Sequence, residues 1–168
     1  MTSQIRVRPA RTADVAAIME LRQPLEGTVV LLSRERVGWY EQIQELVVAV
    51  DEADRVVGAG ALHVMWQDLA EVRSLVVAEN MRGHGVGRRI LDELLARAAG
   101  LGIKRVFCLT FETAFFEKYG FEAISDVPVD AETYAELVRS HDDGVAEFLD
   151  LARVKQNTLG NTRMLKLL

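Results

Sequence analysis

The chain has 168 residues, the length of one domain, and its content of 49% apolar and 27% charged residues is that of an ordinary soluble globule. A net charge of −5 argues against the basic face that nonspecific binding of nucleic acid requires. No apolar run could span a membrane, no signal peptide is recognisable, and Cys108, the only cysteine, excludes an intramolecular disulfide. We expect a cytoplasmic protein with a single domain over residues 1–168.

The first half of the chain predicts four strands and two helices. The strands cover residues 5–8, 46–50, 56–65 and 71–77. Thr12 is placed to cap the first helix, which Pro24 and Gly27 end. A second amphipathic stretch covers residues 33–44, and a polar turn between the second and third strands predicts a hairpin.

The second half predicts a long helix followed by shorter elements. These are a helix over residues 86–99, a buried strand over 105–110, a short aromatic helix from 113 to 120, a helix near 131–140, and strands around 148–154 and 163–168. Gly100 and Gly102 end the long helix, whose apolar residues recur on one side at helical spacing. The apolar stretch 164–168 is either an inner strand or the seam of a dimer.

The loop between the strand at 71–77 and the long helix is the most informative segment. It contains Arg82, Gly83, His84, Gly85, Val86 and Gly87. Glycine takes a positive φ at little cost and lets a ligand approach the backbone. The first helical turn then offers N–H groups and the positive end of its dipole to an anion. Because Arg88 and Arg89 add positive charge there, we expect a phosphate site.

The spacing in this loop excludes two common nucleotide sites. A P-loop needs Gly-Lys-Ser/Thr at its end, whereas Gly87 is followed by Arg88. A dinucleotide fingerprint needs glycine at the position of Arg88 and an acidic residue roughly twenty residues later, where Val106 and Phe107 stand. Neither nucleotide interpretation fits the sequence.

The pattern that remains is Arg/Gln-x-x-Gly-x-Gly/Ala, met by Arg82, Gly85 and Gly87. It resembles the coenzyme A pyrophosphate loop of the GNAT superfamily of N-acetyltransferases. Four segments, 71–77, 82–87, 106–121 and 161–168, together resemble the acetyltransferase domain of the N-acetylglutamate synthase family in its short, single-domain bacterial form. The resemblance implies an α+β GNAT fold with a mixed central sheet flanked by helices, and acetyl-CoA as co-substrate.

The resemblance also implies which residues form the site. Coenzyme A would be bound by the backbone of Leu75, Val76 and Val77 and by the loop residues Arg82, Gly83, His84, Gly85, Val86 and Gly87. Glu71 would be the general base for the acceptor amine, directly or through water, the alternative being a solvated glutamate. Arg73 shares strand parity with Glu71 and would recognise an acceptor carboxylate. The other acceptor-binding candidates, for which a structural role is equally open, are Asn161, Thr162 and Arg163.

Several other residues receive a structural interpretation. Phe116 stands where many GNAT enzymes have the tyrosine that protonates the leaving thiol, so no acid is assigned. Cys108 is interpreted as a core residue and His63 as a satisfied structural histidine. No spaced cluster of His and Cys supports a metal site, and we expect no metal.

We expect the protein to transfer the acetyl group of acetyl-CoA to the α-amine of L-glutamate, the first step of arginine biosynthesis. Acetylation of glutamine or another small amine is an alternative, and so is a non-catalytic acyl-CoA-binding sensor. The expected partner is a small-molecule amino acid, with no nucleic acid and no membrane. A homodimer and inhibition by arginine are both left open.

Overall fold

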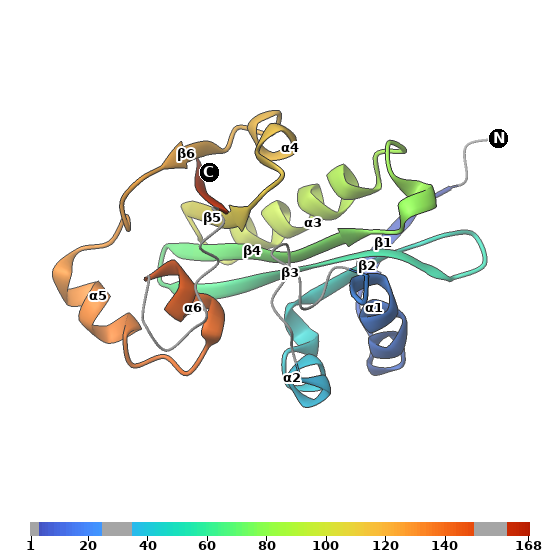
Figure 1. Ribbon diagram of the computed structural model, residues 1–168, viewed down its shortest axis with the longest axis horizontal. Helices are drawn as coiled ribbons and strands as arrows, with labels where there is room; N and C mark the ends of the chain where they lie inside the picture. Colours follow the sequence, from blue (N-terminus) through green and yellow to red (C-terminus); the bar gives the residue numbers. More distant parts are fainter. Residues whose placement is uncertain (1–3, 25–34, 150–160) are drawn as a thin grey trace. The chain divides into compact units, whose positions relative to one another are not determined.

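The computed structural model describes residues 4–24, 35–149 and 161–168 (Figure 1). Its strands are β1 Arg6–Pro9, β2 Leu46–Val50, β3 Val56–Trp66, β4 Leu69–Val77, β5 Arg105–Thr110, β6 Glu122–Ile124 and β7 Thr162–Leu167. Its α-helices are α1 Val15–Arg22, α2 Arg36–Glu41, α3 Val86–Gly100, α4 Thr113–Glu117, α5 Ala131–Leu137 and α6 Asp143–Phe148. Three short 3-10 turns are η1 Thr12–Asp14, η2 Ile43–Glu45 and η3 Glu79–Met81.

The strands form one mixed sheet of seven, in the order β1-β2-β3-β4-β5-β7-β6. The pairing of β4 with β5 is parallel, with a register from Leu69 opposite Arg105 to Glu71 opposite Phe107. The β1–β2, β2–β3, β5–β7 and β6–β7 pairs are antiparallel. The mixed α+β sheet is therefore confirmed, and β7, which contains most of the apolar stretch 164–168, is an inner strand.

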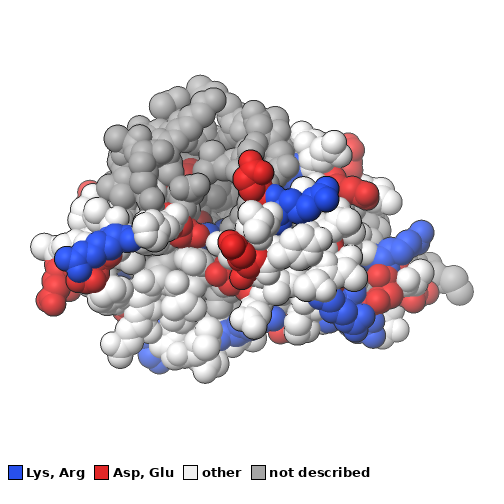
Figure 2. Space-filling model, turned by 90° about the horizontal axis from the view of Figure 1, so that it is seen from below, with Lys and Arg blue, Asp and Glu red and all other residues white. Residues whose placement is uncertain are grey.

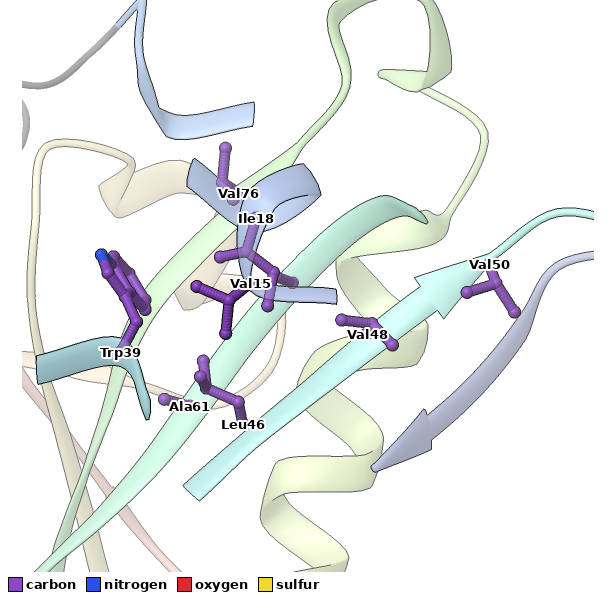
Figure 3. Packing of buried hydrophobic residues seen from close by; sticks show 9 residues of the cluster. Val15, Ile18, Trp39, Leu46, Val48, Val50, Ala61 and Val76 are labelled. Carbon is purple, nitrogen blue, oxygen red and sulfur yellow. The ribbon is translucent and has the colours of Figure 1, made fainter. Parts of the chain in front are cut away.

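The first of two compact units comprises the described residues of Met1–His63 and Val72–Leu101. Helices α1 and α2 lie against one face of its strands and α3 against the other (Figure 1). The core under α1 and α2 consists of Val15, Ile18, Trp39, Leu46, Val48, Val50, Ala59, Ala61 and Val76 (Figure 3). On the opposite face, a Cβ at Gly58 or Gly60 would lie within 3.0 Å of Ile90. The two glycines let α3 approach β3 closely.

The second compact unit comprises the described residues of Val64–Glu71 and Gly102–Leu168. Its core contains Met65, Leu69, Phe107, Leu137, Val145, Phe148 and Leu149. The rings of Phe107 and Phe148 pack with their centroids 4.1 Å apart, which joins β5 to α6. Arg105 donates to Asp68 Oδ2 at 3.0 Å and also to the carbonyl of Pro128. The start of β5 is thereby tied to the turn before β4 and to the chain before α5.

Two local predictions are wrong. Thr12 does not cap a helix: it begins the turn η1, and the Asp14 carboxylate accepts the N–H of Arg11 at 2.7 Å. Phe148 lies at the end of α6 and not in a strand, because Asp142 caps that helix by accepting the N–H of Val145 at 2.9 Å. The rest of the strand expected over 148–154 falls on Leu149 and on positions outside the described residues. Gly27 and residues 33–34 are likewise outside them.

We expect Gly120→Ala to lower the free energy of unfolding by about 1–2 kcal/mol. Gly120 follows α4 with a φ of +86°, and the next N–H, that of Phe121, bonds the carbonyl of Phe116 at 3.2 Å. A Cβ at Gly120 would also lie 2.6 Å from Lys166 Nζ, which donates to the carbonyl of Tyr119. Urea denaturation of the two proteins measures the difference.

Gly100→Ala is the matched control. Gly100 ends α3, and a Cβ there would meet no atom within 4 Å. Alanine in a helix is favoured over glycine by up to about 1 kcal/mol, so this variant should be as stable as the parent or more stable. Equal losses for the two variants would contradict the role assigned to the left-handed backbone at Gly120.

Candidate active site

The loop before α3 has the backbone geometry of an anion site. Gly83 and Gly85 have φ values of +79° and +77°, and a Cβ at either would meet no atom within 4 Å. The turn uses the N–H of His84, which bonds the carbonyl of Met81 at 3.4 Å. Arg89 supplies the first helical N–H, bonded to the carbonyl of Gly85 at 3.2 Å. The first-turn N–H groups that precede it are free of the helical ladder and can bind a phosphate.

The basic side chains around this loop make different contacts, and not all of them are available to a phosphate. Arg82 and His84 are exposed, and His84 Nδ1 lies 2.9 Å from the carbonyl of Arg82 across the turn. Arg88 pairs with Asp92 one helical turn later, at 3.6 Å. Arg89 donates to the carbonyl of Ile5 at 3.0 Å and so ties α3 to the start of β1. Arg82 thus remains a candidate cation for a phosphate.

The strand β4 is interrupted where the resemblance places the acetyl group. Ser74 has a φ of +58°, which is left-handed and uncommon for a residue other than glycine. Such a residue breaks the alternation of a strand and turns the following N–H groups away from a regular ladder. The residues that follow are Leu75, Val76 and Val77, the predicted backbone donors. An interruption of this kind is where backbone donors outside the regular ladder are expected.

Glu71 is a buried carboxylate, with 4% of the residue exposed. It lies opposite Phe107 in the β4–β5 ladder, next to Cys108. Burial raises the pKa of the Cys108 thiol well above its usual range, and the negative charge of Glu71 raises it further. Cys108 is therefore a protonated core residue, as expected, and the Glu71 charge lies near it in a poorly solvated region.

The tail residues lie on β7 and immediately before it. Asn161 Nδ2 donates to Glu147 Oε1 at 2.8 Å, which ties it to α6. Phe107 lies opposite both Glu71 of β4 and Leu165 of β7, so these three side chains are on one face of the sheet. Arg163 is two residues before Leu165, and its side chain is on that face as well. Arg163 Nη1 donates to the carbonyl of Ser125 at 3.5 Å, whereas its buried Nε has no hydrogen-bond partner among the described residues.

Thr162 has the opposite parity to Arg163 on β7, so its side chain leaves the face that carries Glu71 and Arg163. It lies opposite Thr110 at the end of the β5–β7 ladder. Among the tail candidates, Arg163 therefore lies on the face of Glu71 within the second unit. Its Nε is the polar atom that could still donate a hydrogen bond.

Sequence reasoning missed two polar groups in the first unit. Arg22, 4% exposed, lies with its guanidinium carbon 4.9 Å from the ring centroid of Trp39. Its position four residues after the buried Ile18 could have indicated a cation on the inner face of α1. Glu45 contacts His63, with Oε1 and Nδ1 2.8 Å apart, and no local pattern relates two residues so separated in sequence.

Phe116 is a core residue and supplies no acid. It is 5% exposed and packs edge-on against Phe115 and Phe121, each ring pair with centroids 5.1 Å apart. Within residues 4–24, 35–149 and 161–168, no three His, Cys, Asp or Glu side chains are grouped to hold a metal. Over the same ranges, no helix combines the length and the apolar character needed to cross a membrane.

Comparison with known proteins identifies the family. Residues 15–121 match the Acetyltransferase (GNAT) family. The protein named amino-acid acetyltransferase from Mycobacterium tuberculosis is 52% identical over 164 residues, which cover 96% of this chain and 94% of that protein.

Two solved structures extend the comparison. A structure from Mycobacterium tuberculosis, in complex with CoA and a compound designated NLQ, has a TM-score of 0.93 at 52% identity, covering 97% of this chain and 99% of that one. N-acetylglutamate synthase from Neisseria gonorrhoeae, complexed with coenzyme A and N-acetyl-glutamate, has a TM-score of 0.77 at 23% identity and shows the fold alone, over 100% of this chain and 36% of that one. The expected fold and enzyme class are confirmed: the chain belongs to the acetyltransferase (GNAT) family and is an acetyltransferase that uses acetyl-CoA.

Proposed function

We propose that this protein transfers the acetyl group of acetyl-CoA to the α-amine of L-glutamate, as a cytoplasmic enzyme of the first step of arginine biosynthesis. The main support for an amino acid as acceptor is that Glu71 and Arg73 are two residues apart on β4, before the left-handed Ser74. Side chains at this spacing leave the strand on the same side. A carboxylate beside a cation can take a proton from an amine while the cation holds the carboxylate of the same amino acid. The Mycobacterium tuberculosis relative, named amino-acid acetyltransferase, supports this class.

The roles of the residues follow from the chemistry of amide formation. Glu71 accepts a proton from the acceptor nitrogen, which cannot attack while it is an ammonium. The N–H groups of Leu75, Val76 and Val77 donate to the thioester oxygen as it gains negative charge. The loop from Arg82 to Gly87 holds the pyrophosphate of coenzyme A. A thiolate, whose conjugate acid has a pKa near roughly 8.5, leaves without an assigned acid, consistent with the buried Phe116.

The charge of the surface favours a small substrate over a nucleic acid. On the face in Figure 2, basic and acidic side chains alternate, and outside the grey atoms the basic ones form no continuous patch. Arg163, which shares the face of Glu71 in the second unit, adds a half-buried cation to the candidates for binding carboxylates. Glutamate, with two carboxylates, fits several cations better than an amine with none, although glutamine or another small amine remains the alternative acceptor.

Release of free coenzyme A from acetyl-CoA, measured with each of the twenty amino acids, tests this function. Turnover confined to glutamate supports the proposal, and a preference for glutamine supports the alternative. A parallel series with arginine reports whether arginine inhibits this chain. Binding of acetyl-CoA without turnover on any of the twenty would contradict the proposed acceptor class and favour another amine or the sensor.

We expect Arg73→Ala to raise the KM for the acceptor by about tenfold to a hundredfold, because it removes a charge-assisted hydrogen bond worth about 1.5–3 kcal/mol. The KM for acetyl-CoA should change little. Initial rates over a grid of both substrate concentrations separate the two constants.

Arg139→Ala is the control for Arg73. Arg139 follows α5, is exposed, and pairs with Glu136 three residues earlier. Its removal should leave both KM values unchanged. If Arg73→Ala raised the KM for acetyl-CoA as much as that for the acceptor, the arginine would have a structural role and not a role in recognition.

A further inference from the structure

A histidine and a glutamate outside the expected site lie in contact in the first unit. His63 Nδ1, on β3, is 2.8 Å from Glu45 Oε1, on η2. The two side chains are 17% and 25% exposed, so the pair is neither fully buried nor free in solvent. Glu45 Oε2 is itself buried and has no hydrogen-bond partner in the described part of the chain. The carboxylate therefore contacts the imidazole through Oε1 and fixes the orientation of the ring.

The backbone holds this pair in a defined place. Arg97 of α3 donates to the backbone carbonyl of Glu45 at 3.4 Å. Residue 45 is followed directly by Leu46, a core residue at the start of β2. His63 lies two residues after Ala61, which is also in the core. Each partner thus lies within two residues of a fully buried position.

The imidazole lies on the sheet face opposite α3. Ala59 and Ala61 of β3 belong to the core under α1 and α2, whereas Gly58 and Gly60 face Ile90 of α3. Because side chains alternate along a strand, His63 has the direction of Ala59 and Ala61. It is on the face that also carries Trp39 and the buried Arg22.

β3 runs beside the part of β4 where the acetyl group is expected. The N–H of Ala78 bonds the carbonyl of Val57 at 2.9 Å, and a Cβ at Gly60 would lie 3.3 Å from Leu75 Cδ1. The two strands are neighbours in the sheet and joined by a two-residue turn, so they run in opposite directions. His63 is three residues beyond Gly60 and Arg73 is two residues before Leu75, so the two residues lie at about the same level.

Parity places Arg73 on the face of His63 as well. Met65 shares the direction of His63 on β3, and it packs in one cluster with Leu69 of β4. Arg73 is four residues after Leu69 on the same strand, before the interruption at Ser74. A cation proposed to hold the acceptor carboxylate and an imidazole supported by a carboxylate therefore occupy one face, close to the predicted oxyanion donors.

The two protons that the acceptor nitrogen loses can be taken by two different groups. An amino acid arrives as an ammonium and ends as an amide, so its nitrogen loses two protons. One is lost before attack, when the nitrogen lone pair is freed. The other is lost after the N–C bond forms, as the C–S bond breaks and its electron pair goes to sulfur. Sulfur takes up one proton and solvent takes the other, which balances the reaction. A single carboxylate such as Glu71 can hold only one of these two protons at a time.

We infer that His63, held by Glu45, takes the second proton, which the acceptor nitrogen loses after the N–C bond forms, and passes it to the departing thiolate. Glu71 takes the first proton, as in the proposed function, and releases it to solvent. The Glu45 carboxylate, in contact with the partly exposed ring, compensates the charge on the imidazolium until the thiolate takes its proton. Glu45 does not touch the substrate in this scheme, and it is a positioning residue that acts through His63. The inference rests on acetylation of an amine, as in the proposed function, and not on which amine it is.

The test compares His63→Gln and Glu45→Gln with the parent protein, using whichever amino acid the parent acetylates fastest. Glutamine at position 63 can still donate a hydrogen bond to Glu45 but cannot take a proton. We expect kcat to fall by roughly a hundredfold, with the KM for acetyl-CoA unchanged. Glu45→Gln keeps the hydrogen bond and removes the charge, and should lower kcat by about tenfold. The double variant should be no slower than His63→Gln, because Glu45 acts only through His63.

Matched controls remove the same groups elsewhere. His141→Gln and Glu41→Gln change exposed side chains of the same types, and both should retain the parent kcat. A fall of less than about threefold in His63→Gln would overturn the inference, as would a double variant whose losses multiply. So would a raised acceptor KM with unchanged kcat, which would make His63 a binding residue.

Loss of folding and failure of the proposed function are both distinguishable from failure of the inference. If His63→Gln lowers Tm strongly, Glu45→Gln decides, since a purely structural carboxylate would lower Tm and leave kcat unchanged. If the parent acetylates an amino acid other than glutamate, the proposed acceptor is wrong, and the same kcat comparison on that amino acid still supports or overturns the role of His63.

Discussion

Gly85→Glu should abolish measurable binding of coenzyme A. Gly85 has a φ of +77° and directly precedes α3. A Cβ built at Gly85 would meet no atom within 4 Å. A glutamate there adds backbone strain, fills the space into which the pyrophosphate must enter, and puts a negative charge at the helix N-terminus. We expect the Kd to rise by at least about a hundredfold, on the order of 3 kcal/mol, in isothermal titration with coenzyme A.

Gly102→Glu is a closely matched control. Gly102 has a φ of +82°, and a Cβ there would also meet no atom within 4 Å. It lies just beyond the other end of α3, where the helix dipole does not attract an anion. The control carries the same strain and the same added charge and should bind coenzyme A as the parent does. Unchanged affinity in Gly85→Glu, or an equal loss in both variants, would remove the loop from the coenzyme A site.

Glu71→Gln should lower kcat/KM for the acceptor by about a hundredfold or more at neutral pH. The amide has nearly the shape of the carboxylate but cannot accept the proton that the acceptor nitrogen must lose. The deficit should shrink at high pH, where the amine is already neutral in solution. Rates measured from neutral pH to above the pKa of the amine, at saturating acetyl-CoA, give the profile.

Glu122→Gln is the control for Glu71. Glu122 begins β6 and is exposed, so the same substitution there should leave the rate unchanged at every pH. Because Glu71 is buried, its variant also needs a measured Tm, to show that the lost rate is not lost folding. A deficit that is the same at all pH values would exclude Glu71 as the base and leave it a structural carboxylate.

The elements that the sequence predicted well are those with a strong local pattern. β2 and β5 have the predicted bounds, Leu46–Val50 and Arg105–Thr110, because a short, mainly apolar run bounded by polar turns is typical of a buried strand. α3 differs from its prediction by one residue, since its apolar face and its flanking glycines define it locally.

The elements that were missed or misassigned depend on contacts distant in sequence. β6 has only three residues, none of them fully buried, and exists because it pairs with β7 some forty residues away. Phe148 was expected in a strand because it is apolar and aromatic, whereas its packing on Phe107 is made from a helix. An apolar residue has no preference that identifies its element until its partner is known.

The sequence by itself determined the family and the mixed sheet, and it predicted the loop that we propose for coenzyme A. Glycines at Gly83 and Gly85 need no partner to indicate a left-handed turn before a helix, because the constraint is in the backbone itself.

Only the tertiary structure decided which side chains near the site are available for chemistry. Arg89, whose charge was expected to favour a phosphate at the loop, donates to the carbonyl of Ile5, and Glu45 contacts His63. Hydrogen bonds of this kind join residues from different elements, so they depend on how the strands and helices pack and leave no periodic trace in the sequence.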